Sequence, residues 1–223
     1  MQPIYTLACP APDVCTPADV LTALEKAATH HAYFLNVHFD RLYNDFGALW
    51  MIVRCRYTLS RQPKGDITIK TWMRRPTPAL SIRDFDIEDA GGHVGEAVQT
   101  WVVVDAKKRH LMNLKDIPPL WELPYISPER VGALRNLRLP DLPVAAYWTV
   151  DPAEIDDNGH LNNVKYIRHA QQFAPADSRC VEIIYDRECF AGETLTLEAA
   201  DGYVRGVKPD GSESFRARFR SDL

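Results

Sequence analysis

Thr16-Pro17-Ala18-Asp19-Val20-Leu21-Thr22-Ala23-Leu24 has the features of a helix start. Threonine is a favoured N-cap, proline is tolerated at the first helical position, and an acid in the first turn complements the helix dipole. Apolar residues then recur at spacings of three and four, through Leu21, Leu24 and Ala28. The pattern predicts a helix over residues 17–31.

Segments with the alternating apolar pattern of β-strands follow this helix, at residues 50–59, 66–73, 81–89 and 96–105. Turn signals separate them, such as Pro63-Lys64-Gly65 and Ala90-Gly91-Gly92. The first half of the chain is therefore predicted to be a helix followed by an antiparallel meander.

The same order of elements recurs in the second half. A strand at residues 147–150 precedes a polar turn and a helix from Asn162, and strands follow at residues 181–186, 193–200, 203–208 and 212–220. Gly65-Asp66-Ile67-Thr68-Ile69-Lys70 and Gly192-Glu193-Thr194-Leu195-Thr196-Leu197 also share a glycine, an acid and an alternating strand. Because this echo is a weak motif, the predicted duplication depends mainly on the repeated order of elements.

The segment over residues 116–143 is dense in proline and has no sustained periodicity, which is typical of an extended connector. We therefore predict an N-terminal unit over residues 1–115, a connector over residues 116–143 and a C-terminal unit over residues 144–223. A long helix packed on a curved antiparallel sheet, formed twice, indicates an α+β protein made of two hot-dog units.

A cluster of polar side chains precedes the second predicted helix, in Asp156-Asp157-Asn158-Gly159-His160-Leu161-Asn162-Asn163-Val164-Lys165-Tyr166. Unpaired N–H groups and the dipole at a helix N-terminus can stabilise a carbonyl oxygen that gains negative charge, as acyl transfer requires. Asp and Asn are also ordinary N-caps, and Asn-Gly is an ordinary turn. A cap explains one side chain rather than four, so we predict a functional site at Asp156, Asn158, His160 and Asn163.

The composition is that of an ordinary globular chain, with 223 residues, 46% hydrophobic and 25% charged. The net charge of −4 gives no overall attraction to nucleic acid or to anionic membranes. Five cysteines without a Cys-x-x-Cys pair argue against a disulfide framework and favour a reducing compartment. The chain shows no signal-peptide pattern and no apolar segment of membrane-spanning length, so we expect a cytoplasmic protein.

The chain resembles the acyl-acyl carrier protein (acyl-ACP) thioesterases of plants and bacteria, which are double hot-dog proteins. The resemblance depends on the polar segment above, on Tyr185-Asp186-Arg187-Glu188-Cys189, and on Thr100-Trp101-Val102-Val103-Val104-Asp105 with Arg109. Lys64 departs from the family pattern, which often has tryptophan there. The absence of a plastid transit segment favours a bacterial origin.

The resemblance implies that the C-terminal unit carries the catalytic residues and that the N-terminal unit forms most of the fatty-acyl pocket. It also implies hydrolysis of fatty acyl-ACP to free fatty acid and holo-ACP in fatty acid biosynthesis. The implied partner is an acyl carrier protein that holds the fatty acyl group on its phosphopantetheine arm.

Thioester hydrolysis needs an activated water and a stabilised oxyanion, whereas the thiolate leaves with little help. Our hypothesis is that Glu188 or Asp156 acts as the general base. His160 then protonates the departing group or orients the water, and Asn158 positions the acyl carbonyl or the water. The backbone N–H groups around His160 and Leu161 are expected to face the oxyanion.

A rival hypothesis makes Cys189 a nucleophile that His160 activates and Asn158 orients. A cysteine on an alternating strand is more often a small buried apolar residue. Glu188 beside it is also a chemically sufficient base, so we favour hydrolysis through an activated water.

Substrate-binding positions are predicted at Asn163 of the polar segment and at Trp50, Trp72 and Trp101. The tryptophans are included because core aromatic residues of the first unit would also line an acyl tunnel. The histidines lack the paired spacing of a metal site, and we expect neither a metal nor another cofactor. An acyl-CoA thioesterase, a hot-dog dehydratase and a non-catalytic acyl-binding protein stay open as alternatives, as does a homodimer.

Overall fold

The computed structural model describes residues 3–10, 15–126, 134, 136–156 and 158–221. The strands of this part form one antiparallel sheet in the order β1-β3-β4-β5-β2-β7-β10-β9-β8-β6. In chain order they are β1 (Ile4–Cys9), β2 (Ala48–Leu59), β3 (Ile67–Met73), β4 (Ser81–Asp89), β5 (Gly92–Asp105), β6 (Val144–Thr149), β7 (Cys180–Tyr185), β8 (Thr194–Ala200), β9 (Tyr203–Val207) and β10 (Glu213–Arg220). The helices are α1 (Pro17–Phe34), α2 (Phe39–Phe46), α3 (Pro118–Trp121) and α4 (Asn163–Ala170), with 3₁₀ turns η1 (Leu114–Asp116), η2 (Pro152–Glu154) and η3 (Gln171–Phe173).

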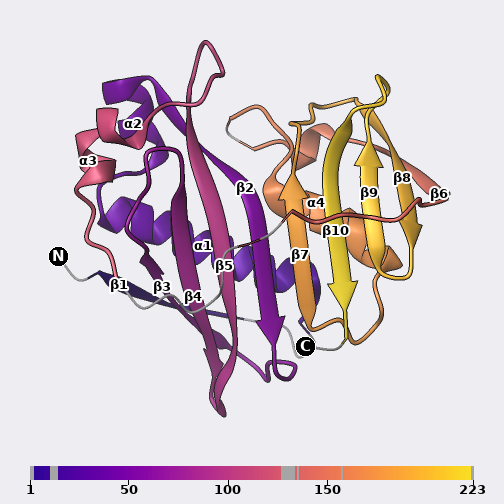
Figure 1. Cartoon of the computed structure of the whole chain (residues 1–223). Helices are drawn as coiled ribbons and strands as arrows, with labels where there is room; N and C mark the ends of the chain where they lie inside the picture. Colours follow the sequence, from indigo (N-terminus) through magenta and orange to yellow (C-terminus); the bar gives the residue numbers. More distant parts are fainter. Residues whose placement is uncertain (1–2, 11–14, 127–133, 135, 157, 222–223) are drawn as a thin grey trace.

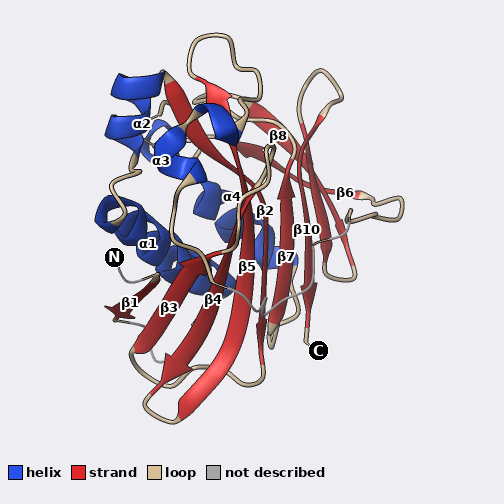
Figure 2. Cartoon of the chain, turned by 60° about the vertical axis from the view of Figure 1, so that its left-hand side comes forward, coloured by secondary structure: helices blue, strands red, loops and turns tan. Residues whose placement is uncertain are grey.

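Helices α1 and α4 lie on the same face of the sheet, which curves around them (Figures 1 and 2). The sheet continues from the first half of the chain into the second because β2 pairs with β7, from Arg54 opposite Ile184 to Thr58 opposite Cys180. The predicted α+β tandem hot-dog fold is confirmed. One hydrophobic cluster runs through both halves, so the predicted unit boundaries at residues 115 and 144 stay a prediction.

Helix α1 begins where the sequence predicts. The Thr16 hydroxyl accepts a hydrogen bond from the Asp19 N–H, and the Asp19 carboxylate accepts one from the Thr16 N–H. This reciprocal capping box satisfies two backbone donors that would otherwise have no helical partner. The helix continues past the predicted end at His31 to Phe34.

The predicted strands of both halves are confirmed to within a few residues at each end. Strand β1 and helix α2 were not predicted. In β1 only Cys9 is fully buried, because the strand lies at the edge of the sheet and pairs with β3 alone among the described strands. Its sequence therefore carries a weak apolar alternation.

The predicted extended connector over residues 116–143 is partly wrong. Its first residues form the end of η1 and helix α3, and Ile117 and Leu120 are buried in a hydrophobic cluster with Leu42 and Met73. Proline is compatible with the first turn of a helix, so Pro118 and Pro119 do not prevent this packing. Pro128 lies outside the described residues. None of the helices in the described ranges has the length and apolar character needed to cross a membrane.

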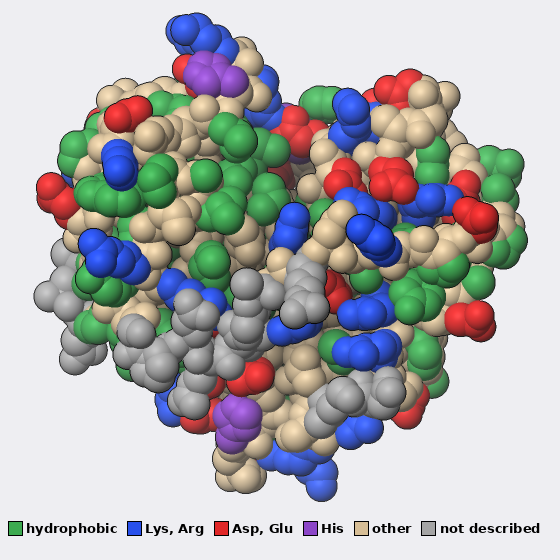
Figure 3. Space-filling model, in the orientation of Figure 1, with side chains coloured by type: hydrophobic (Ala, Val, Ile, Leu, Met, Phe, Trp, Pro, Cys, Tyr) green, Lys and Arg blue, Asp and Glu red, His purple; other side chains and the backbone are tan. Residues whose placement is uncertain are grey.

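The outer face of the sheet over β7, β9 and β10 carries many basic side chains (Figure 3). Two arginines of β10 pair with acids: Arg216 lies 2.9 Å from Asp186, directly after β7, and Arg218 lies 2.8 Å from Glu182 on β7. The alternation of arginines along β10 thus forms ion pairs across the strands, as is common on a solvated sheet face.

His31 is a fully buried histidine on the sheet side of α1. Its Nδ1 lies 2.7 Å from Nη1 of Arg83 on β4, and its ring stacks on Tyr5 of β1 with the centroids 5.6 Å apart. Burial, together with the positive charge of Arg83, lowers the pKa of His31 from 6.5 to about 3. The folded protein therefore holds this imidazole neutral.

We expect the free energy of unfolding to decrease as the pH falls from 6.5 towards about 3, because only the unfolded chain binds the His31 proton in that range. Above that range the group contributes no pH dependence. Urea unfolding at a series of pH values would measure this slope for the parent and for His31→Gln. Equal slopes in the two proteins would contradict the expectation.

Candidate active site

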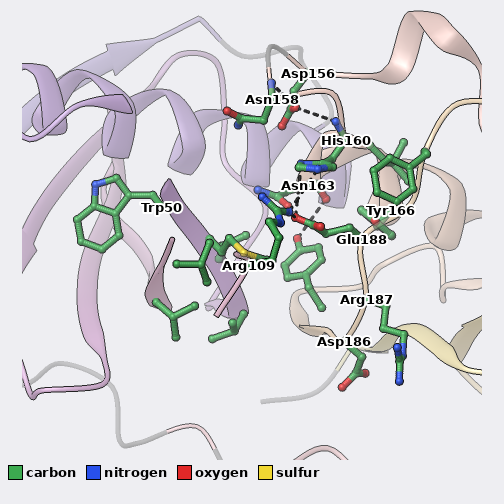
Figure 4. Close-up of a pocket in the computed structure, with 18 of the residues that line it drawn as sticks. Trp50, Arg109, Asp156, Asn158, His160, Asn163, Tyr166, Asp186, Arg187 and Glu188 are labelled. Atoms are coloured by element: carbon green, nitrogen blue, oxygen red, sulfur yellow. Dashed lines mark hydrogen bonds and ion pairs between the residues drawn. The ribbon is translucent and has the colours of Figure 1, made fainter. Parts of the chain in front are cut away.

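A pocket of about 580 Å³ is lined by residues from both halves of the chain (Figure 4). This volume is within the range of small-molecule sites. One side is apolar and comes from β2 and β5, including Met51, Val53 and Val102. The other side comes from the polar loop before α4 and from the residues that follow β7.

His160 and Glu188 meet at this pocket although they are far apart in the sequence. The Nδ1 atom of His160 lies 3.4 Å from Oε1 of Glu188, and the two side chains are 18% and 25% exposed. The Phe190 ring packs edge-on against the imidazole, with the centroids 5.3 Å apart. The structure thus brings together an imidazole and a carboxylate that water can still reach.

Asp156 and Asn158 lie in the loop before α4 and also line the pocket. The Oδ1 atom of Asp156 accepts hydrogen bonds from the N–H groups of Asn158, at 2.8 Å, and His160, at 3.3 Å. The carboxylate therefore shapes the loop that carries His160. Between described residues, the side-chain amide of Asn158 makes no hydrogen bond of its own.

The backbone N–H groups of His160 and Leu161, predicted to face the oxyanion, already donate hydrogen bonds within the protein. The Leu161 N–H donates to the carbonyl of Cys189 at 2.9 Å, and the His160 N–H donates to Asp156. The side chain of Asn162 caps α4 by accepting from the Val164 N–H at 2.9 Å. The expectation that the amides of His160 and Leu161 face the substrate was wrong, because the loop and the chain after β7 pair with each other there.

Residues 15–117 match the family model described as the acyl-ACP thioesterase N-terminal domain. This part of the chain is similar to that domain of the acyl-ACP thioesterases. A palmitoyl-ACP thioesterase of Cuphea hookeriana is 25% identical over 178 residues, which cover 68% of this chain and 40% of that protein. An oleoyl-ACP thioesterase of Coriandrum sativum is 24% identical and covers 67% of this chain and 42% of that protein. The chain thus spans less than half the length of these relatives.

Solved structures of acyl-ACP thioesterases have the same fold as this chain. An acyl-ACP thioesterase of Bacteroides thetaiotaomicron superposes with a TM-score of 0.84 at 20% identity, covering 97% of this chain and 96% of that chain. The 12:0-ACP thioesterase of Umbellularia californica gives a TM-score of 0.80 at 16% identity, covering 99% and 97%. At such identities the likeness concerns the fold alone.

Arg109 also belongs to the candidate site, although the sequence did not predict it as a site residue. Its Nη2 atom contacts Oε1 of Glu188 and lies 3.3 Å from Nε2 of His160. The segment that carried the resemblance contains Arg109, but nothing in the sequence pattern placed it beside the second half of the chain. Only the folded structure brings these three side chains together (Figure 4).

Asn163 and Trp50, two of the predicted substrate-binding residues, line the pocket. Trp72 and Trp101 lie outside the set of described residues that line it. Trp101 instead packs edge-on against Trp50 with the centroids 6.2 Å apart, and Trp72 is buried in β3. The binding roles of these residues stay predictions.

Lys208, directly after β9, holds the segment that carries Glu188. Its Nζ atom donates to the Glu188 carbonyl at 2.8 Å and lies 2.9 Å from Oε2 of Glu193. It also lies 5.6 Å from the centre of the Phe190 ring. Sequence reasoning missed this lysine because its partners are distant in the chain.

Cys189 is fully buried and is not one of the described residues that line the pocket. Its Sγ atom lies 2.9 Å from Oγ of Ser214, and burial raises the pKa of the thiol. A buried protonated thiol is a poor nucleophile. The described residues contain no group of three or more His, Cys, Asp and Glu side chains that could hold a metal ion.

We expect Cys189→Ala to retain thioester hydrolysis within about threefold of the parent, because the thiol is protonated and enclosed. Steady-state kinetics on one acyl thioester would measure this, with circular dichroism to show that the variant is folded. A covalent acyl-enzyme on Cys189, detected by mass spectrometry of the parent after rapid acid quenching, would instead support the nucleophile hypothesis.

Proposed function

We propose that this protein is a hydrolase that cleaves the thioester of fatty acyl-ACP to free fatty acid and holo-ACP in fatty acid biosynthesis. The observation that carries the proposal is the His160–Glu188 pair at a pocket with an apolar wall from β2 and β5. Such a pocket suits an acyl chain, and the pair suits activation of a water molecule. The named relatives act on acyl-ACP.

In the proposed reaction, Glu188 takes a proton from a water molecule whose oxygen attacks the thioester carbonyl carbon. The carbonyl oxygen becomes an oxyanion. Because the nearby backbone donors are engaged, the side-chain amide of Asn158 is the proposed donor to it. The carbon–sulfur bond then breaks, the thiolate takes the proton of His160, and Glu188 passes the proton that it took from water to the imidazole nitrogen left unprotonated. Asp156 holds the loop that carries Asn158 and His160.

A carrier protein with an acidic surface is the proposed partner. The turn that carries Arg109 also presents the exposed lysines Lys107 and Lys108 close to the pocket. Complementary charge at this position would orient an incoming acidic partner. We propose a cytoplasmic location, since all five cysteines are free thiols, as is usual in a reducing compartment.

The test is release of free thiol and fatty acid from a panel of acyl-ACP and acyl-CoA thioesters of different chain lengths. Faster hydrolysis of the ACP thioesters is the expected result, and the panel also gives the chain-length preference. Preference for acyl-CoA would replace the proposed substrate by the coenzyme A thioester. A folded parent that binds acyl thioesters without releasing either product would refute the proposed hydrolysis.

A further inference from the structure

We propose that Arg109 is a positioning residue that holds Glu188 and His160 in their reactive arrangement, an inference that rests on the hydrolase function proposed above. Arg109 comes from the turn after β5 in the first half of the chain, whereas its two partners belong to the second half. The arrangement of the candidate acid-base pair would therefore depend on a residue outside its own half.

Hydrogen bonds within the turn after β5 fix the backbone that carries the Arg109 side chain. The Asp105 carboxylate accepts hydrogen bonds from the N–H groups of Lys107 and Lys108, at 2.9 and 2.7 Å. The Arg109 N–H donates to the Asp105 carbonyl at 2.9 Å, and Arg109 has a φ of +56°. Residues other than glycine rarely adopt positive φ, and such conformations persist where the surrounding structure holds them, often at functional sites.

The contacts of Arg109 define which atoms remain free for chemistry. Arg109 and His160 both approach Oε1 of Glu188, and between described residues no hydrogen bond uses Oε2. Oε2 is thus available to a water molecule while Oε1 is anchored. A guanidinium fixes a carboxylate more firmly than a single neutral donor, because the hydrogen bond is charge-assisted.

The same guanidinium defines the protonation pattern of His160. An arginine side chain donates hydrogen bonds and never accepts them. Its contact with Nε2 at 3.3 Å therefore requires a lone pair on Nε2. In the neutral ring the proton is then on Nδ1, the atom that faces Glu188 at 3.4 Å. Arg109 thus favours one tautomer of the imidazole.

Three variants separate this role from a structural one. Arg109→Gly removes the guanidinium and relaxes the positive φ, since glycine adopts this conformation without strain. Arg109→Lys keeps the positive charge but loses the planar guanidinium and its fixed set of N–H donors. Arg41→Ala removes another exposed guanidinium, from α2, and serves as the matched control. The substrate is an acyl-pantetheine thioester that the parent hydrolyses, so that carrier docking does not enter the comparison.

We expect Arg109→Gly to lose about 10- to 150-fold in kcat, the effect of removing a hydrogen bond to a charged group. KM should stay within about threefold, since the side chain positions reacting groups and does not hold the ground-state substrate. Millimolar guanidinium ion should restore part of the activity of Arg109→Gly and none of Glu188→Gln. Arg109→Gly combined with Glu188→Gln should be no slower than Glu188→Gln alone.

Parent-like kcat in Arg109→Gly would overturn the inference, and so would losses that multiply in the double variant. If the parent hydrolyses no thioester, the proposed function fails and a second measurement decides on Arg109. That measurement is ¹⁵N NMR of the histidine rings, which should show His160 as the Nδ1–H tautomer in the parent and a changed tautomer ratio in Arg109→Gly. Identical spectra for His160 in the two proteins would refute the positioning role.

Discussion

Replacing His160 by alanine is expected to lower kcat for thioester hydrolysis by about 10²- to 10⁴-fold, the range that positioned acid-base groups contribute. The imidazole lies 3.4 Å from Glu188 and packs against Phe190, so its removal takes away a proton donor and leaves the carboxylate without one of its partners. Glu188→Gln should cause a loss of similar size. Rates on one acyl-ACP thioester, measured with saturating substrate, give the comparison.

The two losses should not multiply if His160 and Glu188 act in one proton-transfer unit. The double variant is then expected to be about as slow as the slower single variant. His110→Ala is the matched control, because His110 is exposed in the same turn as Arg109 and does not line the pocket among the described residues. Folded His160→Ala with parent-like hydrolysis would refute the assignment of this site.

Replacing Asp84 by alanine is expected to lower the free energy of unfolding by about 3–5 kcal/mol, the usual cost of removing one partner from a buried ion pair. The side chains of Arg74 and Asp84 are 6% and 0% exposed. Two oxygens of the carboxylate accept from Nε and Nη2 of the guanidinium, each at 2.7 Å. Without the carboxylate, the buried guanidinium loses both of these charge-assisted hydrogen bonds.

Thermal and urea unfolding would measure this effect, with an expected decrease in Tm of about 6–20 °C for a chain of this size. Glu88→Ala provides the control, because Glu88 lies on the same strand and forms a 2.7 Å pair with Lys70 whose side chains are 30–39% exposed. That exposed pair should contribute less than about 1 kcal/mol. Equal losses in the two variants would show that burial does not determine the contribution of Asp84.

Local signals predicted most of the fold. The capping box at Thr16 and Asp19 marks the start of α1, and period-two alternation marks the strands of both halves. Elements with weak or unusual patterns were missed or misassigned. Strand β1 buries little, and α3 begins in a proline-rich segment whose Leu120 is buried only because a cluster from α2 and β3 is present.

For the candidate site, the sequence identified residues but not their partners. The density of polar side chains from Asp156 to Asn163 indicated a site. In the structure the pocket is lined by Asp156, Asn158, His160 and Asn163. The predicted amide donors near His160 were wrong because a hydrogen bond to the Cys189 carbonyl engages Leu161 and the Asp156 carboxylate engages His160. The sequence pattern does not show which acceptors in the folded protein will engage these backbone N–H groups.

By itself, the sequence determined the order of most helices and strands, the tandem α+β architecture and the polar loop, since periodicity, caps and turns depend on residues near one another in the chain. The tertiary structure alone decided that Arg109 meets Glu188 and His160, that Cys189 is enclosed, and that the pocket takes its apolar wall from β2 and β5. The physical reason is that these contacts depend on the pairing of β2 with β7 and on the turn after β5, which bring together segments with no local relation.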